Sequence, residues 1–160
     1  MSERFQVIPA VYVLLRQGDQ VLLQLRQNTG YMDGHWAVAA AGHIEVGESV
    51  TEAACRETTE ELSITIRVED LEPLCTMQRS QPVTGPTSER VDFFFQCTTW
   101  TGTPQVAEPD KAADIGWFDM TDLPRPMVAH EAALIEAVAA NTLSAIESFG
   151  FGSDDTFGCG

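Results

Sequence analysis

The sequence predicts an α/β fold in which a mixed β-sheet lies between helices. Residues 5–15 and 21–25 are apolar runs separated by a Gly18-Asp19 turn, which is typical of a β-hairpin. Residues 50–62 and 127–146 have the periodicity or the alanine content of helices. Alternating strands and helices would suit a parallel sheet, but the long hairpins favour a mixed one.

The other strands are expected at short apolar segments between turn signals. The run Phe93-Phe94-Phe95 predicts a strand that is buried on both faces. We expect one domain over residues 1–147 and a flexible tail over 148–160. The remaining predicted elements are strands at 36–41, 64–68, 74–79, 91–99 and 115–118 and a loop at 81–88.

Composition indicates a single compact enzyme domain. The chain has 160 residues, 44% of them hydrophobic, and a net charge of −15 with a single lysine. Such a charge argues against nucleic acid or an anionic membrane as a partner, and a phosphate site would need a bound cation. Four cysteines without CxxC spacing and an N-terminus without a long apolar segment predict a cytoplasmic protein with reduced thiols.

The most informative segment is residues 42–64, GHIEVGESVTEAACRETTEELSI. Glu57, Glu60 and Glu61 stand three and four positions apart, so they share one face of the predicted helix. Carboxylates this close repel one another, and a hard cation such as Mg²⁺ would remove that cost. Ser49 and Glu52 form a capping-box start. The fixed spacing runs through Gly42, Glu48, Arg56, Glu57, Glu60 and Glu61.

This spacing resembles the signature of the Nudix hydrolases, and the flanking segments are similar to a bacterial MutT-like branch of that family. Thr58 and Ser63 depart from the signature, which has a bulky aliphatic residue and a glycine at these positions. Ser63 must therefore form the turn after the helix without the freedom of glycine at positive φ. The resemblance covers about residues 5–145 and implies an α/β/α sandwich.

The resemblance also implies the roles of the site residues. Glu57, Glu60 and Glu61 would bind Mg²⁺ or Mn²⁺, together with the main-chain carbonyl of Ala41. Arg56 and Glu48 would orient the carboxylates. Glu57 is the first candidate for the catalytic base.

Glu108, in a later loop, is the second candidate for the base or for an additional metal ligand. His43, next to Gly42, is a weaker candidate for contact with the substrate, whereas His35 and His130 are expected at the surface or in loops. Tyr31 and Trp36 are the candidates for stacking on a nucleobase, although Trp36 could belong to the core instead.

The implied substrate is a small nucleotide, a nucleoside diphosphate linked to a group X. A (d)NTP cleaved to monophosphate and pyrophosphate is the preferred case, and ADP-ribose or a nucleotide sugar is the alternative. A third interpretation is that the protein binds a nucleotide without cleaving it. The sequence is also compatible with a homodimer. The chain has neither GxGxxG nor GxxxxGK[ST], so the sequence supports neither a dinucleotide cofactor nor a P-loop.

Overall fold

The central layer of the molecule is a mixed β-sheet in a computed structural model that describes residues 3–80 and 89–152. Eight strands of this described part form the sheet, in the order β3-β2-β1-β6-β5-β8, with β4 paired to β1 and β7 paired to β2. They are β1 (Ile8–Gln17), β2 (Gln20–Arg26), β3 (Trp36–Val38), β4 (Ala40–His43), β5 (Glu72–Ser80), β6 (Glu89–Cys97), β7 (Ala112–Asp119) and β8 (Ile146–Phe149).

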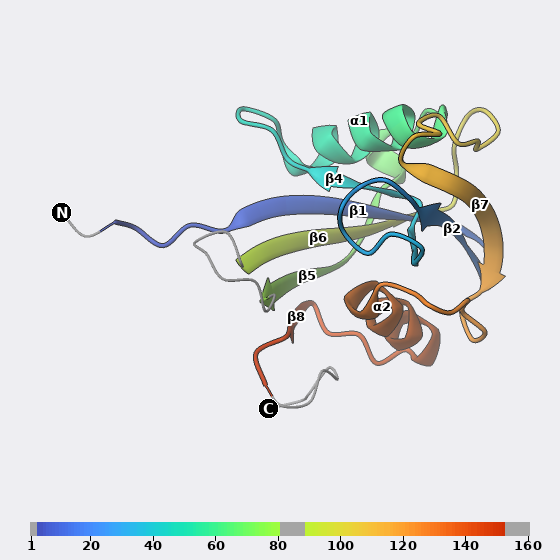
Figure 1. Ribbon diagram of the computed structural model, residues 1–160. Coiled ribbons are helices and arrows are strands. Elements are labelled where there is room, and N and C mark those ends of the chain that lie inside the picture. Colours follow the sequence, from blue (N-terminus) through green and yellow to red (C-terminus); the bar gives the residue numbers. More distant parts are fainter. Residues whose placement is uncertain (1–2, 81–88, 153–160) are drawn as a thin grey trace.

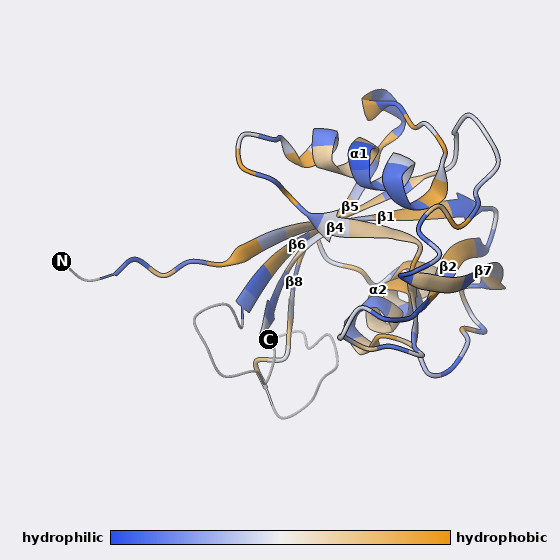
Figure 2. Cartoon of the chain, turned by 45° about the horizontal axis from the view of Figure 1, so that its top comes forward, coloured by the Kyte–Doolittle hydropathy of each residue, from blue (hydrophilic) through white to orange (hydrophobic). Residues whose placement is uncertain are grey.

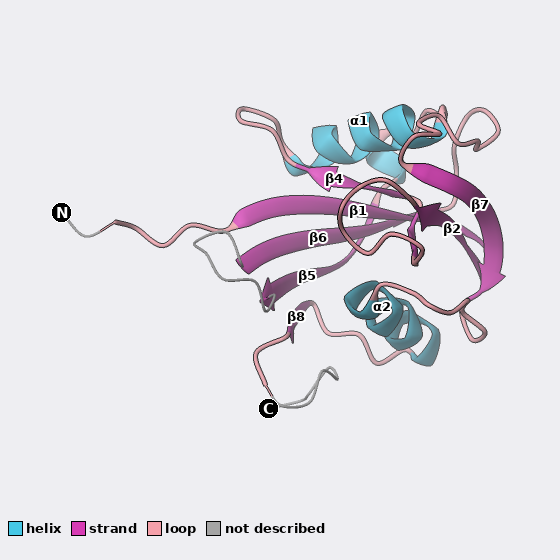
Figure 3. Cartoon of the chain, viewed as in Figure 1, coloured by secondary structure: helices cyan, strands magenta, loops and turns pink. Residues whose placement is uncertain are grey.

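Helices α1 (Val50–Leu62) and α2 (Ala129–Ala140) lie on opposite sides of this sheet (Figures 1 and 3). The arrangement is an α/β/α sandwich, which confirms the predicted fold class. No helix of the described residues is long and apolar enough to cross a membrane.

Strand β1 supplies side chains to both cores of the sandwich. It pairs in parallel with β6 and antiparallel with β4 and β2. Because successive side chains of a strand point to opposite faces, alternate residues of β1 enter different cores. Ala10, Tyr12 and Leu14 pack with Leu134 and Ile135 of α2, whereas Val11, Val13 and Leu15 pack with Ala53, Ala54 and Leu62 of α1.

The three phenylalanines of β6 follow the same alternation. Phe94 packs in the core beneath α2, and Phe93 and Phe95 pack on the side of α1. Because both faces of β6 are covered, the expectation of a strand buried on both sides is confirmed.

Helix α1 begins and ends with the local structures that its sequence favours. The Ser49 hydroxyl accepts the main-chain N–H of Glu52, and the Glu52 carboxylate accepts the N–H of Ser49, so the predicted capping box is present. Thr58 and Leu62 are fully buried, and the helix carries both hydrophilic and hydrophobic residues along its length (Figure 2). Ser63 ends the helix in the left-handed conformation, with φ of 56°.

Three predicted strand segments differ from the structure: the first lacks its N-terminal part, and the other two differ by more than a shift of their ends by a few residues. The first strand starts at Ile8 rather than at residue 5. The segment 36–41 divides at Ala39 into β3, which pairs with β2, and β4, which pairs with β1. The strand expected at 64–68 is wrong, because only Thr65 pairs, with Thr101, before a 3₁₀ helix covers Val68–Asp70.

The C-terminal helix is shorter than predicted, and a strand follows it. Helix α2 ends at Ala140, and Asn141 adopts the left-handed conformation that stops it. Ile146 then begins β8, which pairs in parallel with β5. Ser148 and Phe149, which were assigned to the tail, belong to this strand. The predicted loop 81–88 and residues 153–160 of the predicted tail lie outside the described residues.

We predict that Ser63→Gly raises the free energy of unfolding by about 1 kcal/mol, because glycine adopts positive φ without the steric cost of a Cβ. Urea denaturation measures the change. Asn141→Gly is the matched control: its φ is also 56°, but asparagine tolerates this region better, so we expect a smaller gain. Equal stability of wild type and Ser63→Gly would contradict the prediction.

Candidate active site

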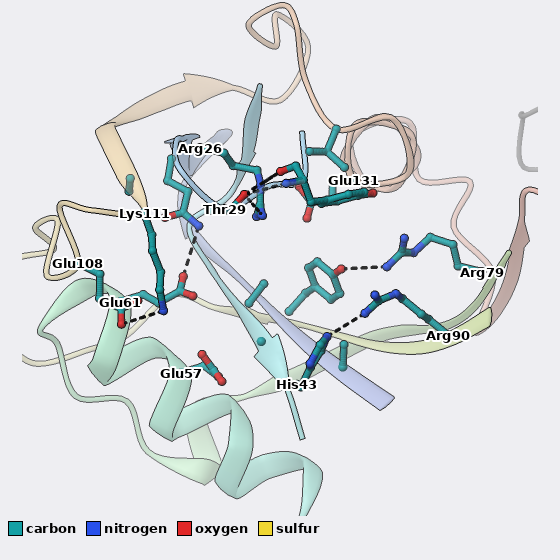
Figure 4. A pocket seen from close by; sticks show the side chains of 18 residues that line it. Arg26, Thr29, His43, Glu57, Glu61, Arg79, Arg90, Glu108, Lys111 and Glu131 are labelled. Atoms are coloured by element: carbon teal, nitrogen blue, oxygen red, sulfur yellow. Dashed lines mark hydrogen bonds and ion pairs between the residues drawn. The ribbon is translucent and has the colours of Figure 1, made fainter. Parts of the chain in front are cut away.

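A polar cavity of about 440 Å³ lies where the carboxylate face of α1 meets the sheet (Figure 4). Its walls come from β1, β2, β4, β5, β6, both helices and the loops before β3 and β7. Four glutamates line it: Glu57 and Glu61 from α1, Glu108 from the loop before β7, and Glu131 from α2. The cavity therefore joins residues from distant parts of the chain.

Arg56 connects the glutamates of α1 to the loop before it. Its guanidinium donates to both carboxylate oxygens of Glu48, at 2.6 and 2.9 Å, and to the main-chain carbonyl of His43 at 3.1 Å. A further nitrogen donates to Glu57 at 2.8 Å and to Glu60 at 3.2 Å. Because Arg has five donors in a fixed plane, one side chain orients three carboxylates.

Gly42 provides space for the Glu57 carboxylate. An added Cβ at this position would overlap the carboxyl group of Glu57. The carboxylate therefore lies directly against the backbone of β4, and any larger residue at position 42 would displace it. This contact explains on steric grounds why the sequence signature has a glycine at this position, which the spacing alone does not reveal.

Burial and mutual repulsion disfavour the charged forms of Glu57 and Glu61. The pKa of Glu61 is raised to about 8, first by burial and then by the charges of Glu57 and Glu108. The pKa of Glu57 is also raised, mainly by burial, although Arg56 opposes the shift. Gln24 donates to the Glu61 carboxylate at 3.3 Å, and a main-chain hydrogen bond from Ala41 also favours its charged form.

The loop that carries Glu108 is fixed by hydrogen bonds to the loop before β3. The side-chain amide of Gln27 donates to the carbonyl of Pro109 at 2.6 Å, and that of Asn28 donates to the carbonyl of Asp110 at 3.2 Å. Both bonds join residues far apart in the sequence. They hold Glu108 at the cavity, which the recognition candidate Tyr31 also lines.

The structure brings only part of the predicted site to the cavity. The predicted residues that line it are Glu57, Glu61, Ala41, Tyr31 and Glu108, and the weaker candidate His43 lines it as well. Glu48, Arg56 and Glu60 are not among the lining residues. Glu48 and Glu60 are connected to the site by their ion pairs with Arg56.

Trp36 also lies outside the lining and packs edge-on against Phe118, with ring centroids 4.7 Å apart. Trp36 is partly buried and packs against the core beneath α2. Tyr31 is half-exposed beneath Arg26, whose guanidinium carbon is 5.5 Å from the ring centroid.

The donor set suits a divalent metal ion, although among the described residues no three His, Cys, Asp or Glu side chains already surround a common point. Glu57, Glu61 and Glu108 face one cavity, and each of the two α1 carboxyls has its pKa raised by the charge of Glu108. Oxygen donors that repel one another in a partly buried space are what a hard cation stabilises.

Sequence reasoning missed the polar residues on the sheet and on α2. Glu131 is fully enclosed, and its carboxylate accepts the main-chain N–H of Val38 at 3.0 Å. Arg79 of β5 forms a buried ion pair with Asp92 of β6 at 2.8 Å. His130 is also buried, at 3% exposure, so the expectation that it lies at the surface is wrong.

No local pattern identifies these residues. Asp92 occurs in an apolar strand, which indicates a buried charge but not its partner.

Comparisons with known proteins show the family of the chain. A family model described as the NUDIX domain matches residues 7–138. The chain is 32% identical over 145 residues to the NAD-capped RNA hydrolase NudC of Pseudomonas syringae pv. tomato, covering 89% of this chain and 48% of that protein. It thus spans about half the length of the curated relatives it matches.

Solved structures agree as well. A MutT NUDIX hydrolase from Burkholderia pseudomallei superposes with a TM-score of 0.75 at 27% identity, over 83% of this chain and 98% of that one. A bifunctional NMN adenylyltransferase/ADP ribose pyrophosphatase from Francisella tularensis, at 19% identity and a TM-score of 0.65 over 88% of this chain and 43% of that one, shares the fold.

The NUDIX domain model covers most of the chain, and the fold is that of a solved NUDIX hydrolase. The chain therefore belongs to the Nudix family. Members of this family generally use divalent metal ions and act on small nucleotide substrates.

We predict that Glu131 makes the stability of the protein fall as pH rises. Burial raises its pKa from 4.5 to about 7 in the folded protein. Between these values the folded state holds a proton that the unfolded state has released. The contribution of Glu131 to the free energy of unfolding therefore declines by about 3 kcal/mol as pH rises through this range, and it stays constant above the folded pKa.

Glu131→Gln keeps an acceptor for Val38 and cannot titrate. Denaturation at pH 5 and pH 8 should show the variant gaining stability relative to wild type at the higher pH. A constant difference between the two proteins at both values would contradict the prediction.

Proposed function

We propose that the protein is a Mg²⁺-dependent pyrophosphohydrolase that cleaves a nucleoside diphosphate linked to a group X. One observation carries the proposal: Glu57, Glu61 and Glu108 converge on one cavity beside the backbone of Ala41. Three repelling carboxylates in a partly buried cavity cost stability, and a divalent cation with a bound diphosphate offsets that cost.

The metal would be held by Glu57, Glu60 and Glu61, with the main-chain carbonyl of Ala41 and with Glu108 as an additional ligand. Mn²⁺ has the same preference for oxygen donors and can substitute for Mg²⁺. When bound, the ion supplies positive charge for the diphosphate and lowers the pKa of a coordinated water. Arg56 holds Glu57 and Glu60 in position for this role.

Glu57 is the proposed catalytic base. Its carboxylate is held between Gly42 and Arg56, so its direction is fixed before substrate binds. In that position it accepts a proton from the water that attacks phosphorus, and the bond between phosphorus and the bridging oxygen breaks. Glu108, which faces the same cavity on a separate loop, is the second candidate for the base.

A (d)NTP, cleaved to a monophosphate and pyrophosphate, is the first substrate proposed. The structural likeness to a MutT NUDIX hydrolase at 27% identity supports it. ADP-ribose or another dinucleotide-like pyrophosphate is the second candidate. The 32% identity to NAD-capped RNA hydrolases supports this class.

The same relatives keep a capped RNA end open as a substrate, so the exclusion of nucleic acid drawn from the charge of −15 is not retained. The alternative of a non-catalytic nucleotide-binding module is disfavoured, because binding alone gives no reason to keep three repelling glutamates. We propose a cytoplasmic location, which suits the free thiols of Cys55, Cys75 and Cys97.

We predict that excess EDTA abolishes activity and that Mg²⁺ or Mn²⁺ restores it. Glu57→Gln and Glu61→Gln should each lower kcat by about a hundredfold or more, the scale of a lost charge interaction in an enclosed site. Glu52→Gln is the matched control, since it lies on the same helix, keeps its capping bond to Ser49 and faces solvent. Full turnover in EDTA, or near wild-type kcat in both site variants, would reject the metal assignment.

We predict that the protein hydrolyses nucleotides to phosphate-containing products and does not hydrolyse phosphomonoesters. A panel of dNTPs, ADP-ribose, NAD and nucleotide sugars, analysed in ¹⁸O-labelled water, identifies the substrate and the cleaved bond. Label should enter one phosphate product, because water attacks phosphorus. Tight nucleotide binding without turnover of any member would favour the binding-module alternative.

A further inference from the structure

The side of the cavity away from Glu108 and Lys111 is lined by basic side chains (Figure 4). Arg79 comes from β5, Arg90 from β6 and His43 from β4, so three strands of one sheet place them together. We name this group of three residues the basic wall. It faces the same cavity as the carboxylates of α1, which gives the cavity two sides of opposite character.

The basic wall carries a positive charge in excess. Arg79 pairs with Asp92 at 2.8 Å and also donates to the hydroxyl of Tyr12 at 3.4 Å. Arg90 lies 2.8 Å from the Nε2 of His43, and in the described part of the chain it forms no ion pair with a carboxylate. Among the described residues, the two guanidinium groups thus form one ion pair between them, that of Arg79 with Asp92.

The neighbouring titratable groups do not fully neutralise this charge. A guanidinium nitrogen can only donate, so the Nε2 of His43 accepts from Arg90 in the neutral form of the imidazole. His130, behind Tyr12, is also neutral because burial lowers its pKa well below the ordinary value. Glu131 has a pKa of about 7 and is partly protonated near neutrality.

Arg90 retains hydrogen-bonding capacity. Its Nε is buried and has no partner among the described residues, and only one of its terminal nitrogens is used by His43. A guanidinium in a partly enclosed cavity binds an anion more strongly than one in water, and its planar fork matches the oxygens of a phosphate. Arg90 thus presents to a cavity of substrate size a guanidinium that forms no ion pair in the described part of the chain.

We infer that the basic wall binds a phosphate group of the substrate other than the two joined by the cleaved bond. The inference rests on the proposed function, which defines the bond that is cleaved. It limits the substrates to those that carry an additional phosphate. That phosphate is either the terminal one of a triphosphate or one attached to X. Both sources present the same oxyanion to Arg90 and Arg79.

The first test measures binding of inorganic phosphate by calorimetry in excess EDTA. Without divalent cations the carboxylates of α1 repel phosphate, so binding under these conditions reports on the cationic side chains of the cavity and needs no turnover. These side chains include Arg26 and Lys111, and the Arg90 variant assigns the binding to the basic wall. We expect wild type to bind and Arg90→Gln to bind at least about tenfold more weakly, the scale of a lost charged hydrogen bond. Phosphate binding that is absent from wild type, or unchanged in Arg90→Gln, would overturn the inference.

Two further variants separate the site from general charge and from misfolding. Arg125→Gln removes one positive charge from the surface pair with Glu136, outside the cavity, and should leave phosphate binding unchanged. Arg90→Lys keeps the charge but loses the fork, so it should bind phosphate more weakly than wild type even if Arg90→Gln fails to fold. Equal weakening by Arg125→Gln would show a general charge effect and reject the site.

The second test identifies the source of the phosphate with matched substrates. The pairs are dATP with dADP, and coenzyme A with dephospho-coenzyme A. In one pair the member with the additional phosphate should have a KM lower by about tenfold, and Arg90→Gln should remove that difference. Turnover without a difference in either pair would reject the inference but retain the proposed function. Phosphate binding without turnover of these four compounds or of any member of the nucleotide panel above would reject the proposed function instead.

Discussion

The arrangement of the site depends on the hydrogen bonds and ion pairs made by the guanidinium of Arg56. It connects the loop before α1, through Glu48, to Glu57 and Glu60 on the helix and to the carbonyl of His43 at the end of β4. One cation thus offsets the repulsion among three carboxylates and joins helix to sheet at the same point. Because Glu57 is held by it above Gly42, the direction of the carboxylate is set by the fold rather than by a ligand.

The sequence could predict this part of the molecule because its determinants are local. The capping box of Ser49 and Glu52 and the 3.6-residue period determine where α1 begins and which side chains share its face. Local alternation also located most strands, since Phe93, Phe94 and Phe95 pack on both sides of β6 as expected. In each case the information lies within a few residues of the feature.

The rest of the site depends on pairing across the sheet, which no local pattern contains. Arg79 and Asp92 become partners because β5 and β6 are antiparallel neighbours, and Glu131 reaches the cavity because α2 packs against Val38. The segment 64–68 has the composition of a strand, but the chain turns at Ser63 and meets only Thr101. Tertiary contacts therefore override propensity there.

The hydrogen bonds that fix the Glu108 loop have a consequence for how this enzyme could change its specificity. Gln27 and Asn28 bind the main-chain carbonyls of Pro109 and Asp110, not their side chains. Because every residue has a carbonyl, the path of the loop is independent of which residues occupy these positions. Substitutions around Glu108 can thus alter one wall of the cavity during evolution while the carboxylate keeps its place.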